Sequence, residues 1–589
     1  MVYKGIAVSP GLGLGKCLIL KEMVLLSYSQ QNPGCMDTEV EKNKVKDGIL
    51  KAVMQLDSIK AKIEDKGAVD RGEIIEAQIM LLQDPTLLKN INSKIEQGMQ
   101  SSLDSTGICG IEAVQRVIDE QAEMFGNIDD AYLKERAQDV RDIGRRIINA
   151  MTGIQEMDLL NLSEGTILVG HNITPSQMAS IDRKRVKAII SEVGGRTSHT
   201  AILANSMEIP AVFGCSDICM KLSDGMLLSV NGSKGLVETE LTLQRLEVLQ
   251  TEIEKYVKQR AILEDMSQKP TLTLDGKKAE LFANIMSPLD VVKVQKAGAD
   301  GIGLYRTEFL FMDRKSAPGE EEQFQAYRQV VQAMQGKPVI IRTMDIGGDK
   351  NVEYLNLPKE ENPFIGYRAI RICLNDKALF KTQLRAILRA SAYGRTLIMF
   401  PMIGSIEELR SAKLILYETK EELNSEGIAF DGSIPVGIMV EVPSAAVMAD
   451  ILIKEADFFS IGTNDLTQYT LAVDRMNENL SGLYNSFQPG VLRLIKNVIS
   501  AVDQEDKNKF AGMCGEMAGD PYATILLLGL GLHEFSVNPS SVLKIKKIIS
   551  LVDMAYARKV VEKVMILSTA AEIEEYLHKV TKEVAGDIL

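Results

Sequence analysis

The chain has 589 residues and a mass of 64.9 kDa, with 45% hydrophobic and 25% charged residues, which predicts two to four soluble domains. A net charge of −13 argues against nucleic-acid binding, and we find no apolar run long enough to span a membrane. Seven scattered cysteines and the lack of a signal peptide favour a reduced, cytoplasmic protein.

The N-terminal part predicts an α/β domain that is interrupted by helices. Residues 5–20 have the pattern of strands and turns, whereas apolar residues recur at helical spacing between about Thr38 and Thr152. Strand-like sequence resumes at Thr166–Gly170 and continues to about Val237. We therefore predict an α/β domain formed by residues 1–30 and 153–237, with residues 31–152 as an inserted helical bundle.

His199 is one of four histidines and follows a glycine pair, Gly194 and Gly195. The helical pattern after it predicts that Thr197 or Ser198 caps a helix whose first turn contains His199. Free N–H groups at a helix start favour an anion, and a neutral imidazole is a competent nucleophile. The motif is typical of a phosphoryl carrier, but a capping or buried histidine after a glycine turn has the same local pattern.

Residues 238–266 predict a helical linker. From Leu241 to Asp265 the chain contains neither glycine nor proline and has apolar residues on one side of the expected helix. This composition favours a semi-rigid connector over a flexible one.

Residues 267–589 predict a TIM (β/α)8 barrel, since eight apolar strand-like runs alternate with helical stretches. A doubly wound open sheet is the alternative. The runs are 281–284, 301–306, 339–342, 397–400, 436–441, 458–464, 510–514 and 534–538.

Arginine, acidic or cysteine residues stand at the ends of five of these runs, and in barrels of this kind the active site lies at the carboxyl ends of the strands. Arginine forks suit phosphate or carboxylate, carboxylates suit Mg²⁺, and a cysteine thiol can donate a proton. Each residue taken alone could equally be a solvated loop residue or, for the cysteine, a small core residue. The strand-end residues are Arg306, Arg342, Glu441, Asn464, Asp465 and Cys514, and Arg475 follows in the next loop.

Several long motifs resemble Enzyme I of the bacterial sugar phosphotransferase system, the phosphoenolpyruvate–protein phosphotransferases. The resemblance extends from near the N-terminus almost to the C-terminus. The segments that carry it are 194–200, 303–313, 342–350, 360–371, 458–469 and 512–516.

The resemblance implies a site for phosphoenolpyruvate in the barrel. Mg²⁺ would lie on Glu441 and Asp465, and His199 would take the phosphoryl group through Nε2. The substrate phosphate would contact Arg306 and Arg342, its carboxylate would lie near Asn464 and Arg475, and Cys514 would protonate the enolate to give pyruvate.

The resemblance also implies partners and motion. Phosphohistidine would pass its group to the small phosphocarrier protein HPr, docked on the helical insertion near Tyr132–Arg146. The His199 domain would swing between two sites, and the barrel would form a homodimer.

Three residues depart from the pattern of this family. Met178 stands where a threonine is usual, Asn205 where many relatives have arginine, and Gln78 where some have histidine. These changes concern the surroundings of the phosphohistidine and the docking of the carrier, and they leave the barrel motifs intact.

Two alternatives share the phosphohistidine domain and the barrel. Phosphoenolpyruvate synthase and pyruvate phosphate dikinase need a nucleotide-grasp domain, for which we find no sequence signal. A nitrogen-regulatory phosphorelay homologue of Enzyme I usually carries an additional N-terminal sensory domain, whereas here the resemblance begins near Tyr3.

Overall fold

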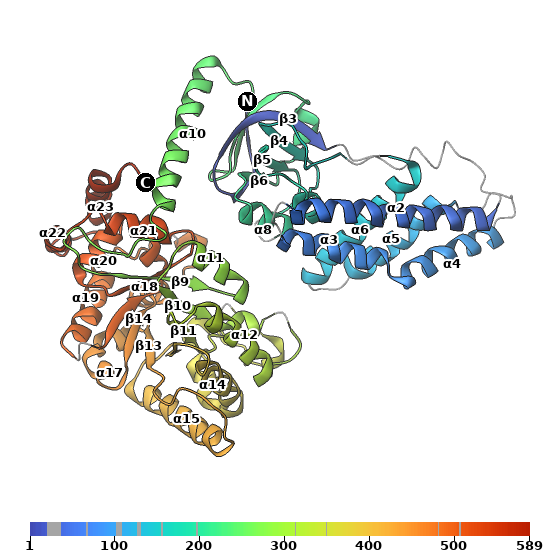
Figure 1. The fold of residues 1–589 in the computed structure, drawn as a ribbon. Coiled ribbons are helices and arrows are strands. Elements are labelled where there is room, and N and C mark those ends of the chain that lie inside the picture. The colour runs from blue at the N-terminus through green and yellow to red at the C-terminus, as the bar shows by residue number, and fades with distance from the viewer. Residues whose placement is uncertain are drawn as a thin grey trace. The chain divides into compact units, whose positions relative to one another are not determined.

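A computed structural model describes residues 1–20, 37–65, 69–101, 109–126, 131–154, 157–195, 198–312, 314–348, 350, 352–480, 482–505 and 508–589. These residues form two compact units, Met1–Lys258 and Gln259–Leu589 (Figure 1). Among the described residues, none of the helices combines the length and the apolar character that crossing a membrane requires.

The first unit is built on an eight-stranded mixed sheet with the order β1-β8-β7-β3-β4-β5-β6-β2. Apolar residues cover both faces of this sheet in two separate clusters, as expected for a sheet buried on both sides. The strands are β1 Val2–Lys4, β2 Ile6–Ser9, β3 Leu12–Leu20, β4 Thr166–Gly170, β5 Val186–Ser191, β6 Ala211–Phe213, β7 Leu227–Asn231 and β8 Leu236–Glu238. The short helices that accompany them are α7 Pro175–Ala179, α8 His199–Ser206 and α9 Ile218–Lys221.

A helical bundle lies between β3 and β4 in sequence, which confirms the predicted insertion (Figure 1). Its long helices bury one continuous apolar core that includes the predicted stripe of Val45, Ile49 and Leu56. The helices are α2 Thr38–Asp65, α3 Val69–Leu82, α4 Pro85–Ser101, α5 Gly110–Gly126 and α6 Ala131–Thr152. The predicted domain boundary at residues 30 and 31 lies outside the described residues.

The linker is a single helix, α10 (Leu243–Glu264), and the boundary between the two units falls within it. Leu249 is the one residue of α10 that is buried among those described.

The second unit is a closed parallel barrel, so the prediction of a TIM barrel is confirmed and the open sheet is excluded. Its strands pair in the order β9 to β16 and then back to β9. They are β9 Glu280–Ile285, β10 Gly301–Arg306, β11 Val339–Arg342, β12 Thr396–Phe400, β13 Val436–Val440, β14 Phe458–Ile461, β15 Phe510–Met513 and β16 Glu534–Val537. Each contains most of one predicted run.

Helices surround the barrel and pack on the outward-facing side chains of its strands (Figure 1). They are α11 Val291–Lys296, α12 Glu320–Ala333, α13 Ile370–Asn375, α14 Lys377–Ser391, α15 Ile406–Ser425, α16 Pro443–Val447, α17 Ala449–Glu455, α18 Thr463–Leu471, α19 Pro489–Asp503, α20 Thr524–Leu530, α21 Val542–Ile549, α22 Met554–Val564 and α23 Ala570–Ala585. The inward-facing residues form a separate small cluster in the barrel lumen, which includes Cys514.

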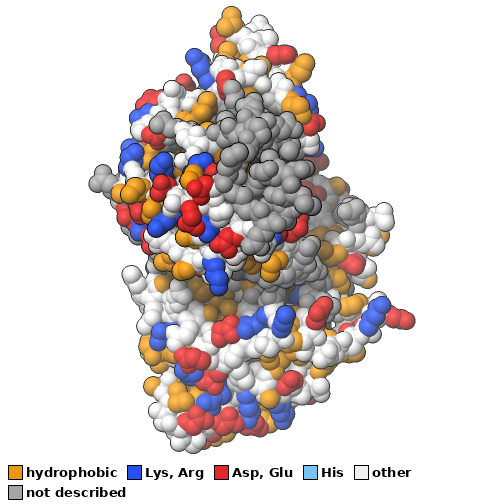
Figure 2. Space-filling model, turned by 90° about the vertical axis from the view of Figure 1, so that its right-hand side faces the viewer, with side chains coloured by type: hydrophobic (Ala, Val, Ile, Leu, Met, Phe, Trp, Pro, Cys, Tyr) orange, Lys and Arg blue, Asp and Glu red, His pale blue; other side chains and the backbone are white. Residues whose placement is uncertain are grey.

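Positive and negative side chains alternate across the face drawn in Figure 2. Among the described residues of that face, no extended basic patch is visible, in keeping with the overall acidic balance of the chain.

Candidate active site

Arg306 ends β10 at the carboxyl face of the barrel and is half-buried. Within the described residues, its guanidinium has no hydrogen bond or ion pair. A half-buried guanidinium that is unpaired among the described residues is suited to bind an anionic ligand in bidentate fashion.

Arg342 ends the neighbouring strand β11 and is 6% exposed. Its Nη2 donates to Glu308 Oε1 and lies 3.2 Å from Asp345 Oδ2. Burial alone would raise the pKa of Glu308, but the charges of Arg342 and Lys350 outweigh it and keep this pKa below its usual value. The carboxylate of Glu308 is therefore ionised and holds the arginine in position.

Asp345 joins three cations at the same face. Its Oδ1 accepts from Arg368 Nη2 at 2.8 Å, and its Oδ2 lies 3.2 Å from Lys350 Nζ as well as from Arg342. Burial would raise the pKa of Asp345, yet Arg368, Arg342 and Lys350 lower it well below the usual range. Gly347 (φ +103°) permits this arrangement, because a Cβ there would lie 2.5 Å from Cβ of Arg368.

Glu441 and Asp465 form the acidic part of the site. Glu441 follows β13 and is 2% exposed, and its Oε1 accepts from the backbone N–H of Met402 at 2.6 Å. Burial, reinforced by the negative charges of Asp465 and Asp345, raises the pKa of Glu441 to about 8. Asp465 Oδ2 accepts from Arg368 at 3.2 Å, while Oδ1 has no hydrogen bond among the described residues and lies 3.4 Å from Arg475 Nη1. Two close carboxylates, one with an unsatisfied oxygen, could hold a divalent cation.

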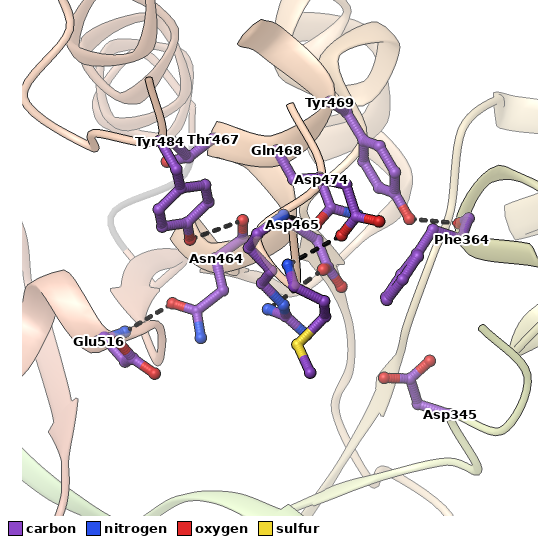
Figure 3. Close-up of polar contacts among 12 residues, drawn as sticks. Asp345, Phe364, Asn464, Asp465, Thr467, Gln468, Tyr469, Asp474, Tyr484 and Glu516 are labelled. Carbon is purple, nitrogen blue, oxygen red and sulfur yellow. Dashed lines mark hydrogen bonds and ion pairs between the residues drawn. The ribbon is translucent and has the colours of Figure 1, made fainter. Parts of the chain in front are cut away.

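Asn464 lies beside Asp465 in Figure 3, and Arg475 is the ion-pair partner of Asp465. Asn464 Oδ1 accepts from the backbone N–H of Glu516 at 2.9 Å, and its carbonyl accepts from the Tyr484 hydroxyl at 3.0 Å. These bonds fix the carboxamide so that its NH₂ group has no partner among the described residues. The loop of Arg475 is held by Gln468, whose Oε1 accepts from the backbone N–H of Arg475 at 3.1 Å.

Cys514 follows β15, is 3% exposed, and faces the barrel lumen. Burial raises the pKa of its thiol to about 11, although the Ser460 hydroxyl and the charge of Arg342 oppose this rise. The group is therefore protonated at neutral pH and can act as a proton donor.

The structure thus brings together seven residues expected from the sequence at one end of the barrel: Arg306, Arg342, Glu441, Asn464, Asp465, Arg475 and Cys514. Reasoning from residue types at strand ends missed Glu308 and Asp345 and left Lys350 and Arg368 unplaced. Acidic residues two or three positions after each strand-end arginine were the available signal, since buried arginines need such partners.

The His199 loop belongs to the first unit. Ser198 caps α8, with Oγ accepting from the backbone N–H of Ala201 at 3.3 Å, and His199 is the first helical residue, as predicted. A cavity of about 230 Å³ adjoins the loop and is lined by Gly194, Ser198 and Thr200 among others. The imidazole of His199, like Arg196 and Thr197, lies outside the described part of the structure.

The three departures from the family pattern have different environments. Met178 is fully buried in the apolar core behind α8, whereas Asn205 is exposed. Gln78 is buried, and its Nε2 donates to Asp142 Oδ2 at 2.8 Å. Asp142 also accepts from Ser176 of α7, so Gln78 takes part in a polar cluster between the bundle and the sheet.

Three family models match successive parts of the chain. Residues 4–136 match the N-terminal region of PEP-utilising enzymes, 162–235 their mobile domain, and 235–554 their PEP-binding domain. These matches define the class of the chain as a PEP-utilising enzyme.

Curated relatives define the class more narrowly. Proteins named "Phosphoenolpyruvate-protein phosphotransferase" match from Haemophilus influenzae (45% identical, covering 98% of this chain and 99% of the relative) and from Enterococcus faecalis (44%, covering 94% of each). One from Staphylococcus aureus is 42% identical over 99% of this chain and 100% of its own length. The chain belongs to the family of phosphoenolpyruvate–protein phosphotransferases, which are transferase enzymes.

Proposed function

We propose that this chain transfers the phosphoryl group of phosphoenolpyruvate to its own His199 and then to the histidine of HPr, releasing pyruvate, as the first step of sugar uptake by the phosphotransferase system. The observation that carries this proposal is the barrel site, where Arg306, whose guanidinium is unpaired among the described residues, lies on the strand next to the buried Arg342. The family relationship supports the choice of phosphoenolpyruvate as the phosphoryl donor.

Mg²⁺ is the proposed cofactor. The described residues contain no group of three or more metal-binding side chains, but Mg²⁺ commonly uses one or two carboxylates and completes its coordination with substrate oxygens and water. Glu441 and the unsatisfied Oδ1 of Asp465 fit this role, because their mutual repulsion would be relieved by a cation. When bound, Mg²⁺ would neutralise charge on the phosphate.

We propose that different side chains of the site bind the phosphate and the carboxylate of the substrate. Arg306 and Arg342 bind the phosphate, the latter held rigidly by Glu308 and Asp345. The carboxylate is bound by the guanidinium of Arg475 and by the NH₂ group of Asn464, which has no partner in the described part of the chain. Catalysis by such a site consists mainly of positioning and charge neutralisation. Cys514 then donates its proton to the methylene carbon of the enolate, which the protonated state of its thiol supports.

The remaining parts have proposed roles that the fold supports. His199 stands at a capped helix start, where backbone N–H groups favour a phosphoryl group. HPr is proposed to dock on the helical bundle near residues 132–146 of α6 and to receive the group there. We further propose that the domain carrying His199 moves between the two sites by bending at the ends of α10, that the barrel forms a homodimer, and that the protein is cytoplasmic.

Labelling with radioactive phosphoenolpyruvate tests the proposal. The full chain is incubated with the labelled compound and Mg²⁺, without nucleotide. One acid-labile phosphoryl group per chain is expected, lost in His199→Ala, retained in the matched control His171→Ala, and discharged by HPr. Label retained in His199→Ala, or a requirement for ATP, would overturn the proposal.

A further inference from the structure

Glu534 is a buried acid that the proposed reaction does not use. It begins β16, is 0% exposed, and neither carboxyl oxygen has a hydrogen-bond partner among the described residues. Burial, with the negative charge of Glu280, raises its pKa well above the usual value and so favours the protonated form. An unpartnered carboxyl group in a barrel core is costly and calls for a function.

Two glycines make room for this carboxyl group. A Cβ at Gly303 on β10 would lie 2.2 Å from Glu534 Oε1, and a Cβ at Gly512 on β15 would lie 1.8 Å from Oε2. A side chain at either position would force the carboxyl group to move from the place that it occupies. The carboxyl group therefore extends across the lumen over strand β15.

Strand register places a hydroxyl and a thiol next to it. Glu534 pairs with Gly512, and Gly512 pairs with Ser460 on β14, so the three residues form one row across adjacent strands. Because Gly512 has no side chain, none separates the carboxyl group of Glu534 from Ser460. The Ser460 Oγ is itself buried and lacks a partner among the described residues.

Cys514 lies two residues beyond Gly512 and so faces the same side of the strand, one layer closer to the substrate site. The Ser460 hydroxyl lies near enough to the Cys514 thiol to lower its pKa, although the two groups form no hydrogen bond. The side-chain oxygens of Glu534 and Ser460, which have no hydrogen bond among the described residues, thus lead toward Cys514, whose thiol donates to the backbone carbonyl of Ile461 at 3.9 Å.

We propose that Glu534 and Ser460 form a proton relay that reprotonates Cys514 from inside the barrel. The proposal rests on the proposed function, in which Cys514 protonates the enolate. Glu534 acts through Cys514 and touches no substrate, so it is a positioning residue for the proton.

Each step of the relay moves one proton. The S–H bond of Cys514 breaks as a C–H bond forms on the enolate, giving pyruvate and a thiolate. The thiolate takes the proton of Ser460, which takes the proton of Glu534 directly or through one water molecule. The resulting carboxylate regains a proton from solvent at the amino-terminal end of the barrel, where Glu280 pairs with Glu534 in register and its side chain is 46% exposed.

Two isotope exchanges on the full chain separate the relay from the phosphoryl transfer. Enzyme, Mg²⁺, phosphoenolpyruvate and ¹⁴C-pyruvate are mixed in D₂O without HPr. Passage of ¹⁴C into phosphoenolpyruvate reports reversible phosphoryl transfer, during which Cys514 can return the hydrogen that it removed. Deuterium in the pyruvate methyl group requires the hydrogen on Cys514 to exchange with solvent.

In Glu534→Gln, an isosteric change that removes the acidic proton, the ratio of deuterium incorporation to ¹⁴C exchange is expected to fall at least about tenfold. Ser460→Ala should lower the same ratio, so the test does not depend on the correct folding of a single variant. The control Ser536→Ala removes another buried hydroxyl, which bonds to Asn284 at 2.6 Å, and should keep the wild-type ratio.

An unchanged ratio in both relay variants, or a proportional loss of the two exchanges, would overturn the relay and leave the proposed function standing. Absence of ¹⁴C exchange in the wild-type enzyme would instead contradict the proposed function itself.

Discussion

Asp345 offers a sharp test of the ion-pair network beneath the phosphate-binding arginines. In Asp345→Asn, Arg368 loses its charged partner at 2.8 Å, and Arg342 and Lys350 each lose one at 3.2 Å. The side chain of Asp345 is 3% exposed, so water cannot replace it. Breaking a buried pair costs about 3–5 kcal/mol, and we expect the barrel to be destabilised by that amount at pH 7.

Urea denaturation of the barrel, followed by tyrosine fluorescence, measures this free energy. Glu455→Gln is the matched control, since it removes the partner of Arg410 at 2.6 Å on the exposed surface, where an ion pair contributes little. The folded-state pKa of Asp345 is depressed, so its contribution exists above the unfolded pKa and disappears as the pH falls through the lower folded value. The difference between wild type and variant should therefore shrink below about pH 4. Equal effects of Asp345→Asn and Glu455→Gln at pH 7 would refute the reasoning.

Three further outcomes are expected. Because the pKa of Glu441 is raised to about 8, Mg²⁺ binding at pH 7 should release a proton. Calorimetry in buffers of different ionisation enthalpy measures this release, which should be absent in Glu441→Gln. No proton release in the wild type would contradict the role of Glu441 as a Mg²⁺ ligand. Ser198→Ala should destabilise the first unit by about 1 kcal/mol in thermal unfolding, and Ser198→Asp should restore it by replacing the cap; equal stabilities of the two variants would count against capping. Asp142→Ala should lower the free energy of unfolding by on the order of 3 kcal/mol, because it leaves Arg145 of the buried cluster without its carboxylate. Asp119 is exposed, so Asp119→Ala should leave the free energy of unfolding nearly unchanged. Similar decreases in both variants would argue against the cluster.

The barrel was predictable because each strand appears as an apolar run between helical stretches, and strand ends mark the active face. The residues at those strand ends, from Arg306 to Cys514, could therefore be predicted from the sequence. Glu308 and Asp345 could not, since an acidic residue shortly after a strand-end arginine becomes significant only when the fold buries it against Arg342. Arg368 likewise reaches Asp345 and Asp465 from a loop distant in sequence.

Glu534 illustrates a different limit. Its strand was predicted, but an acidic residue at the start of a run reads as a solvent-exposed strand end. Only the closure of the barrel, which pairs β16 with both β15 and β9, turns this residue inward.

The collision distances at Gly303 and Gly512 also constrain how related chains can vary. A methyl group at position 512 would require the carboxyl group at 534 to move or to be lost. At position 303 an added Cβ would also lie 2.6 Å from Cβ of Ser536, so loss of the acid alone would not make room there. Positions 512 and 534 should therefore substitute together across an alignment, and a chain with alanine at 512 and glutamate still at 534 would be a counterexample. Positions that surround a single buried functional group should covary in this way, whereas positions at an ordinary packing site would change independently.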